Sequence, residues 1–342
     1  MLGGSERRGV DVSRSQEASC AETRQILVTD NIMATDTISH QILASLNHLS
    51  DVNDYKKERP YEIWLDQLPK GLEQTNVRFE LHDNIPITDA RSVGFDQFDI
   101  ELHGFQFLQQ TFPTQCHIDG SDSANASDEQ RAHILEYIDI MSDFLCQTYG
   151  GVKAVAYDWR VRRSRDSPVN KSPLIYTLPD EADARKITID VAHQVHADGS
   201  PNGIKKSLSY LLTPDEQSEV ISGKYRLRVV NLWRPLVPVV EVQPLAMCDR
   251  RSVVDADWEQ VEKIQTNWIE ESMYLRHNRQ HKWYWLSNQT IDEVTSFVVW
   301  DSEKADSLSA SVPHCSFQVA PPGPSFKQRE SIEIRYLLWT PL

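Results

Sequence analysis

The feature that most constrains the fold is a strictly alternating segment near the C-terminus. From Ser331 to Tyr336, polar or charged side chains alternate with apolar ones, and the polar residues Arg329 and Glu330 precede them. Successive side chains of a β-strand point to opposite faces, so Arg329, Ser331, Glu333 and Arg335 are predicted to share one face of a strand. Two interpretations of this polar face stay open: a solvent-exposed face of an antiparallel sheet, or the interior of a barrel.

Other parts of the chain have the same character. Strands are predicted, from alternation or short buried apolar runs, at 78–82, 98–102, 105–107, 152–157, 187–191, 225–233, 283–286, 294–300 and 330–339. Three helices are expected between them: one from Ser127 to Gly150, a short one capped by Thr213, and a longer one at 257–276. The first of these should bury the stripe Ile134, Ile138, Met141 and Leu145. The pattern therefore predicts a mainly β protein with inserted helices.

The domain organisation follows from length and composition. With 342 residues, of which 40% are hydrophobic, the chain is long enough to bury a full core. Residues 1–40 are rich in Ser, Arg, Glu, Asp and Thr and show little periodicity. We therefore expect a disordered leader over 1–40 and a single domain over 41–342.

Charge and cysteine content narrow the class of partner. The net charge of -15 and the absence of a long Lys/Arg run disfavour nucleic acid and anionic membranes. No apolar run reaches membrane-spanning length. The five cysteines are scattered, odd in number and form no CxxC pair, which favours a reducing compartment. We expect a cytoplasmic protein with a small-molecule ligand, and the sequence predicts no oligomeric state.

Two His-x-Asp triplets stand out as possible metal-binding pairs. His117 and Asp119 lie in a Pro/Ser/Asp-rich stretch, where we expect a solvent loop. His196 and Asp198 instead follow a predicted strand, which is a more rigid scaffold for ligands. A third ligand must come from a distant segment. The candidates are His193, His277, His281 and His314.

The spacing of these candidates separates them. His193 lies three residues before His196, which points it to the opposite strand face, where packing or surface exposure is expected. His277 and His281 flank a charged turn, where solvated histidines are usual. His314 is preferred because the alternating polar strand follows it. Two histidines and one carboxylate on one face of a metal leave the other coordination positions open.

Several blocks of the sequence resemble one known family. They are Val195-His196-Ala197-Asp198, Asn231-Leu232-Trp233-Arg234-Pro235-Leu236, Pro244-Leu245-Ala246-Met247-Cys248-Asp249, Asp301-Ser302, Pro313-His314 and Arg329-Glu330-Ser331-Ile332-Glu333-Ile334-Arg335. In order and spacing they are similar to the fungal asaB-type hydroxylase/desaturase family, which includes a gibberellin desaturase. The similarity extends over about 87–338, with further landmarks at 102–105 and 157–163. The Asn-x-Trp-Arg-Pro block is its most specific motif.

The resemblance implies a fold, a cofactor set and site residues. It implies a double-stranded β-helix (jelly-roll/cupin-like) core of the Fe(II)/2-oxoglutarate oxygenase type. His196, Asp198 and His314 would be the metal ligands, Arg329 the anchor of 2-oxoglutarate, and Ser331 its assistant. The implied activity is hydroxylation or desaturation of a small-molecule fungal secondary metabolite.

Some alternatives remain beside this expectation. Relatives of the family in tropolone-sesquiterpenoid pathways are credited with hetero-Diels-Alder chemistry, so a cofactor-independent pericyclase on the same fold is the rival function. Arg335 and Arg234 are reserve candidates for carboxylate binding, with a buried structural ion pair as the competing role. Trp233 and the 283–285 aromatic cluster either line a substrate pocket or fill the core. The arginines of 160–165 either gate a cleft or carry exposed charge.

Overall fold

A computed structural model gives the fold of the protein. It describes residues 40–51, 53–65, 68, 70–116, 118, 128–164, 191–319 and 326–342. The predictions for the leader 1–40, apart from its last residue, for the His117/Asp119 pair and for the start of the strand at 187–191 lie outside these residues. Among the helices that the structure describes, none combines the length and apolar character needed to cross a membrane.

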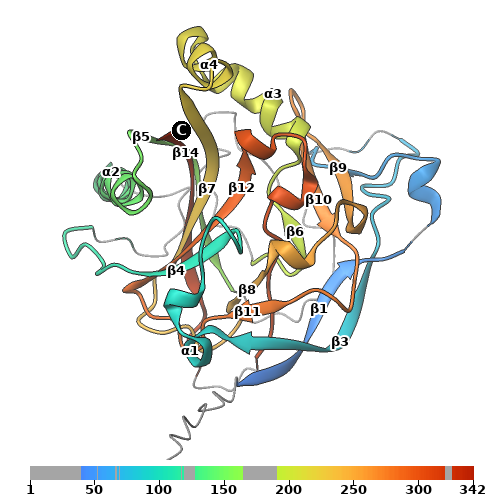
Figure 1. The fold of residues 1–342 in the computed structure, drawn as a ribbon. Helices are drawn as coiled ribbons and strands as arrows, with labels where there is room; N and C mark the ends of the chain where they lie inside the picture. Colours follow the sequence, from blue (N-terminus) through green and yellow to red (C-terminus); the bar gives the residue numbers. More distant parts are fainter. Residues whose placement is uncertain are drawn as a thin grey trace, which may run out of the picture. The chain divides into compact units, whose positions relative to one another are not determined.

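Two sheets make up the described part of the chain (Figure 1). The nine-stranded sheet has the order β1 (Gln41–Leu49), β3 (Phe79–Asp89), β11 (Trp283–Trp285), β8 (Leu245–Cys248), β13 (His314–Ser316), β6 (His196–Ala197), β10 (Ile269–Leu275), β9 (Trp258–Ile264) and β2 (Tyr61–Ile63). The five-stranded sheet has the order β4 (Phe105–Gln109), β12 (Glu293–Asp301), β7 (Tyr225–Pro235), β14 (Glu330–Pro341) and β5 (Lys153–Arg163). The prediction of a mainly β protein with inserted helices is confirmed.

The space between the sheets is filled by side chains of alternating positions. On β7, Val229 and Trp233 contribute to a core cluster shared with β8, which belongs to the other sheet, whereas Val230 and Leu232 belong to the cluster on the opposite face. This period of two is the one expected of strands that bury both faces. Toward one end of β14 the inward residues are Leu337 and Trp339, and toward the other they are polar.

The polar face of β14 is buried. Arg329, Ser331, Glu333 and Arg335 are 2%, 1%, 5% and 7% exposed. The alternative of a solvent-exposed face is therefore wrong, and the strand supplies polar groups to the interior. Charged groups that are this buried need hydrogen-bonding or ionic partners.

The helices are α1 (Ala90–Val93), α2 (Asp128–Tyr149), α3 (Pro201–Leu211) and α4 (Pro214–Ile221). The predicted stripe of α2 is confirmed: Ile134, Ile138, Met141 and Leu145 are buried in a cluster with β5 and β14. The Tyr336 hydroxyl donates to the Ile138 carbonyl at 2.9 Å and so ties β14 to this helix. Ser127, the expected cap, lies outside the described residues. The predicted start of α4 is also confirmed, with a complete capping box between Thr213 and Glu216.

The helix expected at 257–276 is absent, and a hairpin stands in its place. β9 and β10 pair antiparallel from Leu275 opposite Trp258 to Ile269 opposite Ile264, and the Gln265 amide donates to the Trp268 carbonyl across the turn. Glu, Gln and Lys residues of β9 have high helix propensity, and they suggested a helix. Cross-strand pairing and the burial of β10 from Glu271 to Leu275 override that preference.

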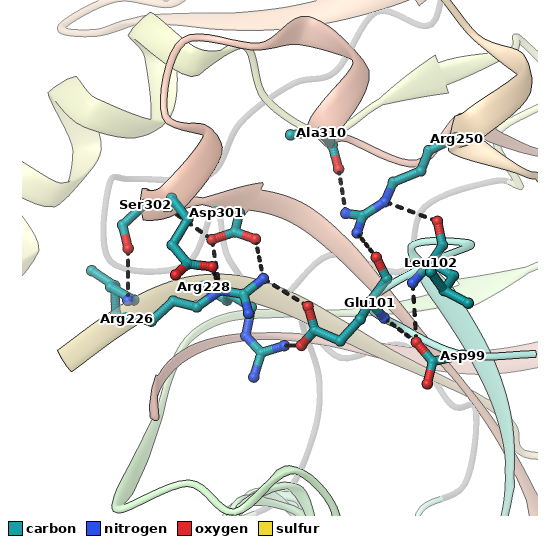
Figure 2. Close-up of polar contacts among 11 residues, drawn as sticks. Asp99, Glu101, Leu102, Arg226, Arg228, Arg250, Asp301, Ser302 and Ala310 are labelled. Carbon is teal, nitrogen blue, oxygen red and sulfur yellow. Dashed lines mark hydrogen bonds and ion pairs between the residues drawn. The ribbon is translucent and has the colours of Figure 1, made fainter. Parts of the chain in front are cut away.

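The strand expected at 98–102 is also wrong, because this segment forms a turn. The Asp99 carboxylate accepts hydrogen bonds from the amides of Glu101 and Leu102, which turns the chain before β4. Figure 2 shows how this turn is fastened: Arg250 donates to the carbonyls of Leu102 and Ala310, and Arg226 bridges Glu101 and Asp301. The turn thus joins β7, β12 and the segment after β8 through partly exposed ion pairs of Glu101 and through hydrogen bonds.

Candidate metal centre

Two histidines from strands far apart in sequence lie side by side on adjacent strands of the nine-stranded sheet. His196 on β6 pairs directly with His314 on β13, and their ring centroids are 4.3 Å apart. Both strands are short, two and three residues, and both are paired on two sides. The backbone register therefore sets the separation of the two imidazoles. The Phe297 ring packs on His314 at 4.6 Å and limits its rotation.

Backbone carbonyls orient both rings in the same way. Nδ1 of His196 lies 2.8 Å from the Gln194 carbonyl oxygen, and Nδ1 of His314 lies 3.1 Å from the Val312 carbonyl oxygen. A carbonyl can only accept, so each Nδ1 carries the proton and each Nε2 keeps its lone pair in the neutral ring. Hydrogen bonding of the non-ligating nitrogen is the usual support of a metal-binding histidine.

Asp198 completes the set directly after β6. Its Oδ1 lies 3.7 Å from Nε2 of His196, and its Oδ2 lies 4.0 Å from Nε2 of His314. One donor atom from each of these three residues lies within 4.8 Å of the others, and all three residues are buried. Among the residues that the structure describes, this is the one group of three or more such donors that meets that distance.

The carboxylate of Asp198 is held by two residues of the five-stranded sheet. Asn231 on β7 donates from Nδ2 to Oδ2 at 2.6 Å, and Arg335 on β14 donates to Oδ1 at 2.7 Å. Arg335 also contacts Asp158 on β5 at 3.1 Å, and Asn231 also contacts Glu333 at 3.3 Å. This network spans the two sheets and fixes the carboxylate opposite the histidines.

The electrostatics keep His196 and Asp198 in metal-binding form. Burial and the neighbouring His314 lower the pKa of His196 well below 6.5, so the ring is neutral at physiological pH. Burial alone would raise the pKa of Asp198, but Arg335 and the two histidines outweigh it and hold that pKa well below 3.8. A carboxylate and neutral imidazoles are the protonation states that bind a divalent cation.

A cavity opens beside these residues, with about 250 Å³ of empty space including its mouth. His196 and His314 line it together with Arg162, Ala192, Trp233, Leu245, Cys315, Ser316, Arg329 and Glu333. The Arg329 guanidinium lies over the Trp233 ring at 5.4 Å and donates to the Gln243 carbonyl and the Ser316 hydroxyl. These contacts hold the Arg329 guanidinium at the cavity wall, next to β13, which carries His314.

The predicted helper Ser331 has a different status. It is not among the residues that line the cavity, but its Oγ is buried and has no hydrogen-bond partner within the described structure. An unsatisfied buried hydroxyl is costly unless a further group completes it. Its position two residues after Arg329 on β14 is compatible with a shared ligand.

The reserve candidates divide into two groups. Arg335 takes part in the site, but as the ion-pair partner of Asp198. Arg234 points to the opposite face of β7, where it donates to the carbonyls of Gln110 and Ile291, so it is not available to a ligand in the cavity. Trp233 lines the cavity, whereas Trp283 and Trp285 belong to a core cluster, which is the core role that the sequence left open for them.

One participant was missed from the sequence. Asn231 lies in the Asn-x-Trp-Arg-Pro block, whose specificity was noted without a role for its first residue. Because side chains alternate along β7, Asn231 and Trp233 face the site, whereas Arg234 makes its hydrogen bonds on the opposite face of the strand. A polar residue two positions before an inward tryptophan on a buried strand was the available signal.

The chain resembles known proteins over most of its length. Residues 46–339 match the family model described as Oxidoreductase/YMDC permease-like domain. The hydroxylase/desaturase efuI of Hormonema carpetanum is 28% identical over 267 residues, which cover 75% of this chain and 83% of that protein. The Fe(II)/2-oxoglutarate-dependent dioxygenase nvfI of Aspergillus novofumigatus is 28% identical over 286 residues, with 81% and 91% covered. The predicted relationship to fungal hydroxylases and desaturases is confirmed.

A solved structure confirms the fold. The iron and alpha-ketoglutarate-dependent endoperoxidase NvfI superposes with a TM-score of 0.69 at 23% identity, over 88% of this chain and 99% of that one. Together with the two paired sheets, this likeness confirms the predicted double-stranded β-helix core.

Proposed function

The chain belongs to the family described as Oxidoreductase/YMDC permease-like domain, and we propose that it is an Fe(II)/2-oxoglutarate-dependent oxidoreductase that hydroxylates or desaturates a small-molecule fungal secondary metabolite. The main support for the proposal is that His196, Asp198 and His314 lie close together beside a cavity that Arg329 also lines. The name of nvfI supports this class of cofactor, and the name of efuI supports hydroxylation or desaturation.

His196, Asp198 and His314 are the proposed ligands of iron(II). The donor chemistry fits, because both Nε2 atoms keep a lone pair and Asp198 stays ionised. Two imidazoles and one carboxylate suit this ion and leave coordination positions for a cosubstrate and dioxygen. When bound, iron(II) would activate dioxygen, which is the oxidant: one oxygen atom would enter succinate as 2-oxoglutarate loses carbon dioxide, and the other would oxidise the substrate C–H group.

Arg329 is the proposed anchor for the distal carboxylate of 2-oxoglutarate. Its guanidinium is always charged, is fixed over Trp233, and lines the cavity that the histidines also line. A guanidinium can bind a carboxylate with two parallel hydrogen bonds. Ser331 is proposed to add its otherwise unsatisfied hydroxyl to the same carboxylate.

The rest of the chain keeps the site rigid and dry. Asn231 and Arg335 hold Asp198 from the opposite sheet, so the carboxylate does not have to be ordered when the metal binds. Trp233 and Leu245 give the cavity an apolar part against which a hydrocarbon portion of a substrate can pack. Exclusion of water favours oxidation of a bound C–H group over side reactions.

The partner and the compartment complete the proposal. A small-molecule substrate suits the small, partly open cavity, and neither nucleic acid nor a membrane is proposed as a partner. A cytoplasmic location is proposed because the four described cysteines, Cys116, Cys146, Cys248 and Cys315, are free thiols. The pericyclase alternative is not favoured, since a buried and oriented donor set has no use in cofactor-independent cyclisation.

Succinate formation tests the proposed activity. The protein, loaded with iron(II), is incubated with 2-oxoglutarate with and without dioxygen, and succinate is measured. Succinate should form only when iron, 2-oxoglutarate and dioxygen are all present. It should be lost in Asp198→Ala and kept in Asp139→Ala, a matched change of an exposed aspartate on α2. Wild-type protein that forms no succinate, or Asp198→Ala protein that forms as much as wild type, would refute the proposal.

A further inference from the structure

Four histidines form a second cluster outside the cavity. His48 on β1 and His82 on β3 come from neighbouring strands, and His277 and His281 come from the connection between β10 and β11. The His48 ring centroid lies 5.6 Å from that of His82, 5.2 Å from that of His277 and 6.3 Å from that of His281. The rings of His82 and His277 are stacked at 4.2 Å. The predicted solvated roles of His277 and His281 are wrong, because both are packed in this cluster and His281 is 7% exposed.

Two of these rings are held as metal-binding histidines are held. Nδ1 of His48 lies 3.3 Å from the Leu275 carbonyl oxygen, so this nitrogen carries the proton and Nε2 keeps the lone pair. In His281, Nε2 lies 3.1 Å from the Asp257 carboxylate, which leaves the lone pair on Nδ1. The same arrangement, in which a carbonyl or carboxylate orients one nitrogen and the other binds the metal, supports zinc-bound histidines.

Three ring nitrogens of the cluster are unsatisfied. Nε2 of His48, Nδ1 of His277 and Nδ1 of His281 are buried and have no hydrogen-bond partner in the described structure. The His48 side chain is completely buried, and that of His281 is 1% exposed. A buried ring nitrogen without a hydrogen-bond partner lowers the stability of the fold. Three such nitrogens in one cluster indicate a shared partner that accepts their lone pairs.

The charge state of the rings suits a cation. Burial, together with the neighbouring His277 and His281, lowers the pKa of His48 to about 3. Burial also lowers the pKa of His277 and of His281. All three rings are therefore neutral near pH 7, the form in which imidazole binds a metal.

We propose that His48, His277 and His281 bind a borderline divalent transition-metal ion of the zinc type, with His82 as a fourth candidate ligand. Imidazole suits zinc, copper and nickel, whereas calcium and magnesium prefer oxygen donors. The ion ties β1 and β3 to the connection that precedes β11, so its role is structural. The inference is independent of the proposed iron site, because the two clusters share no residue.

The cluster closes by movement of its least buried members. As placed, its donors are not within the 4.8 Å that spans the His196, Asp198 and His314 set. His48 and His281 are anchored by Leu275 and Asp257, so they are the fixed ligands. His277 lies in the connecting segment and His82 is 27% exposed, so the proposal requires these two rings to turn about their side-chain bonds when the ion binds.

Zinc binding in a background without the iron ligands tests the inference. The full chain carrying His196→Ala and His314→Ala is purified without metal, and zinc is titrated against a chromophoric chelator. One zinc equivalent is expected to bind. His277→Ala should abolish it, and Asp257→Asn, which removes a positioning carboxylate, should weaken the affinity on the order of 10- to 100-fold. The exposed His40→Ala serves as the matched control and should retain the zinc.

A second measurement guards against loss of folding. Far-UV circular dichroism is recorded for every variant, and cobalt(II) absorption in the same background reports whether nitrogen donors bind the ion. His277→Ala and His82→Ala are informative even where His48→Ala fails to fold, because their rings are only partly buried. A background protein that binds no zinc, or one whose zinc binding is unchanged by His277→Ala, overturns the inference whether or not the iron site is real.

Discussion

Arg335→Met isolates the ion pair on which the site depends. The side chains of Arg335 and Asp198 are 9% and 5% exposed, and they are joined at 2.7 Å. Removal of one partner from a buried pair leaves an uncompensated charge, which typically costs about 3–5 kcal/mol. Asn231 still donates to the other carboxylate oxygen, so we expect a loss at the lower end, about 3 kcal/mol, in the metal-free protein.

A divalent cation should recover part of this loss. When a metal ion is bound by Asp198, the carboxylate regains a positive neighbour, and the difference in unfolding free energy between variant and wild type becomes smaller. Urea unfolding followed by circular dichroism, with and without anaerobic iron(II), measures both differences. Arg78→Met is the matched control, since its ion pair with Glu73 is exposed and should be worth less than about 1 kcal/mol. A cost for Arg335→Met that is unchanged by metal would refute the reasoning.

Three further outcomes are expected. Gly104→Ala should lower the free energy of unfolding by about 3 kcal/mol or more, because φ is +83° and the new Cβ would lie 2.5 Å from a Val312 side-chain atom. Gly150→Ala should lower it by only about 1 kcal/mol, because φ is +64° but the space around the residue is open. Chemical denaturation of both variants measures the difference. Hydrogen bonds from Lys153 and Thr213 lower the pKa of Glu216 from 4.5 to about 2. Wild type should therefore have a free energy of unfolding roughly 1 kcal/mol higher than that of Glu216→Gln above pH 4.5, and this difference should vanish as the pH falls toward 2. An advantage that persists at pH 2 would contradict the capping-box assignment. Arg329→Lys should weaken 2-oxoglutarate binding by roughly 10-fold or more, measured by titration calorimetry of the zinc-substituted protein, since a point charge replaces a bidentate donor.

Local patterns predicted much of the fold because local physics decided it. The apolar stripe of α2, the capping box of α4 and the alternation of β14 each depend on neighbours within a few residues, and all three were found. The β9–β10 hairpin was not found, because its pairing overrides the helix propensity of its charged residues. At 98–102 the Asp99 side chain turns the chain, although the apolar alternation suggested a strand.

The site was only partly accessible from sequence for a similar reason. His196, Asp198, His314 and Arg329 were named through resemblance, but the direct pairing of His196 with His314 is a register that spans 118 residues of chain and leaves no local trace. The contact between Asp198 and Asn231 is likewise a meeting of two sheets. The histidine cluster around His48 combines three separate segments, and only the 277–281 segment carries a spacing, His-x3-His, that occurs in zinc sites.

The central claim is that one cavity holds iron(II) and 2-oxoglutarate side by side. The most direct test is an anaerobic titration of the metal-free protein with iron(II) and then 2-oxoglutarate, followed by the visible metal-to-ligand charge-transfer band. The band should appear in wild type, be absent in His314→Ala, and require far more 2-oxoglutarate in Arg329→Ala. Wild-type protein that binds no iron and develops no band would contradict the assignment of His196, Asp198 and His314 as ligands.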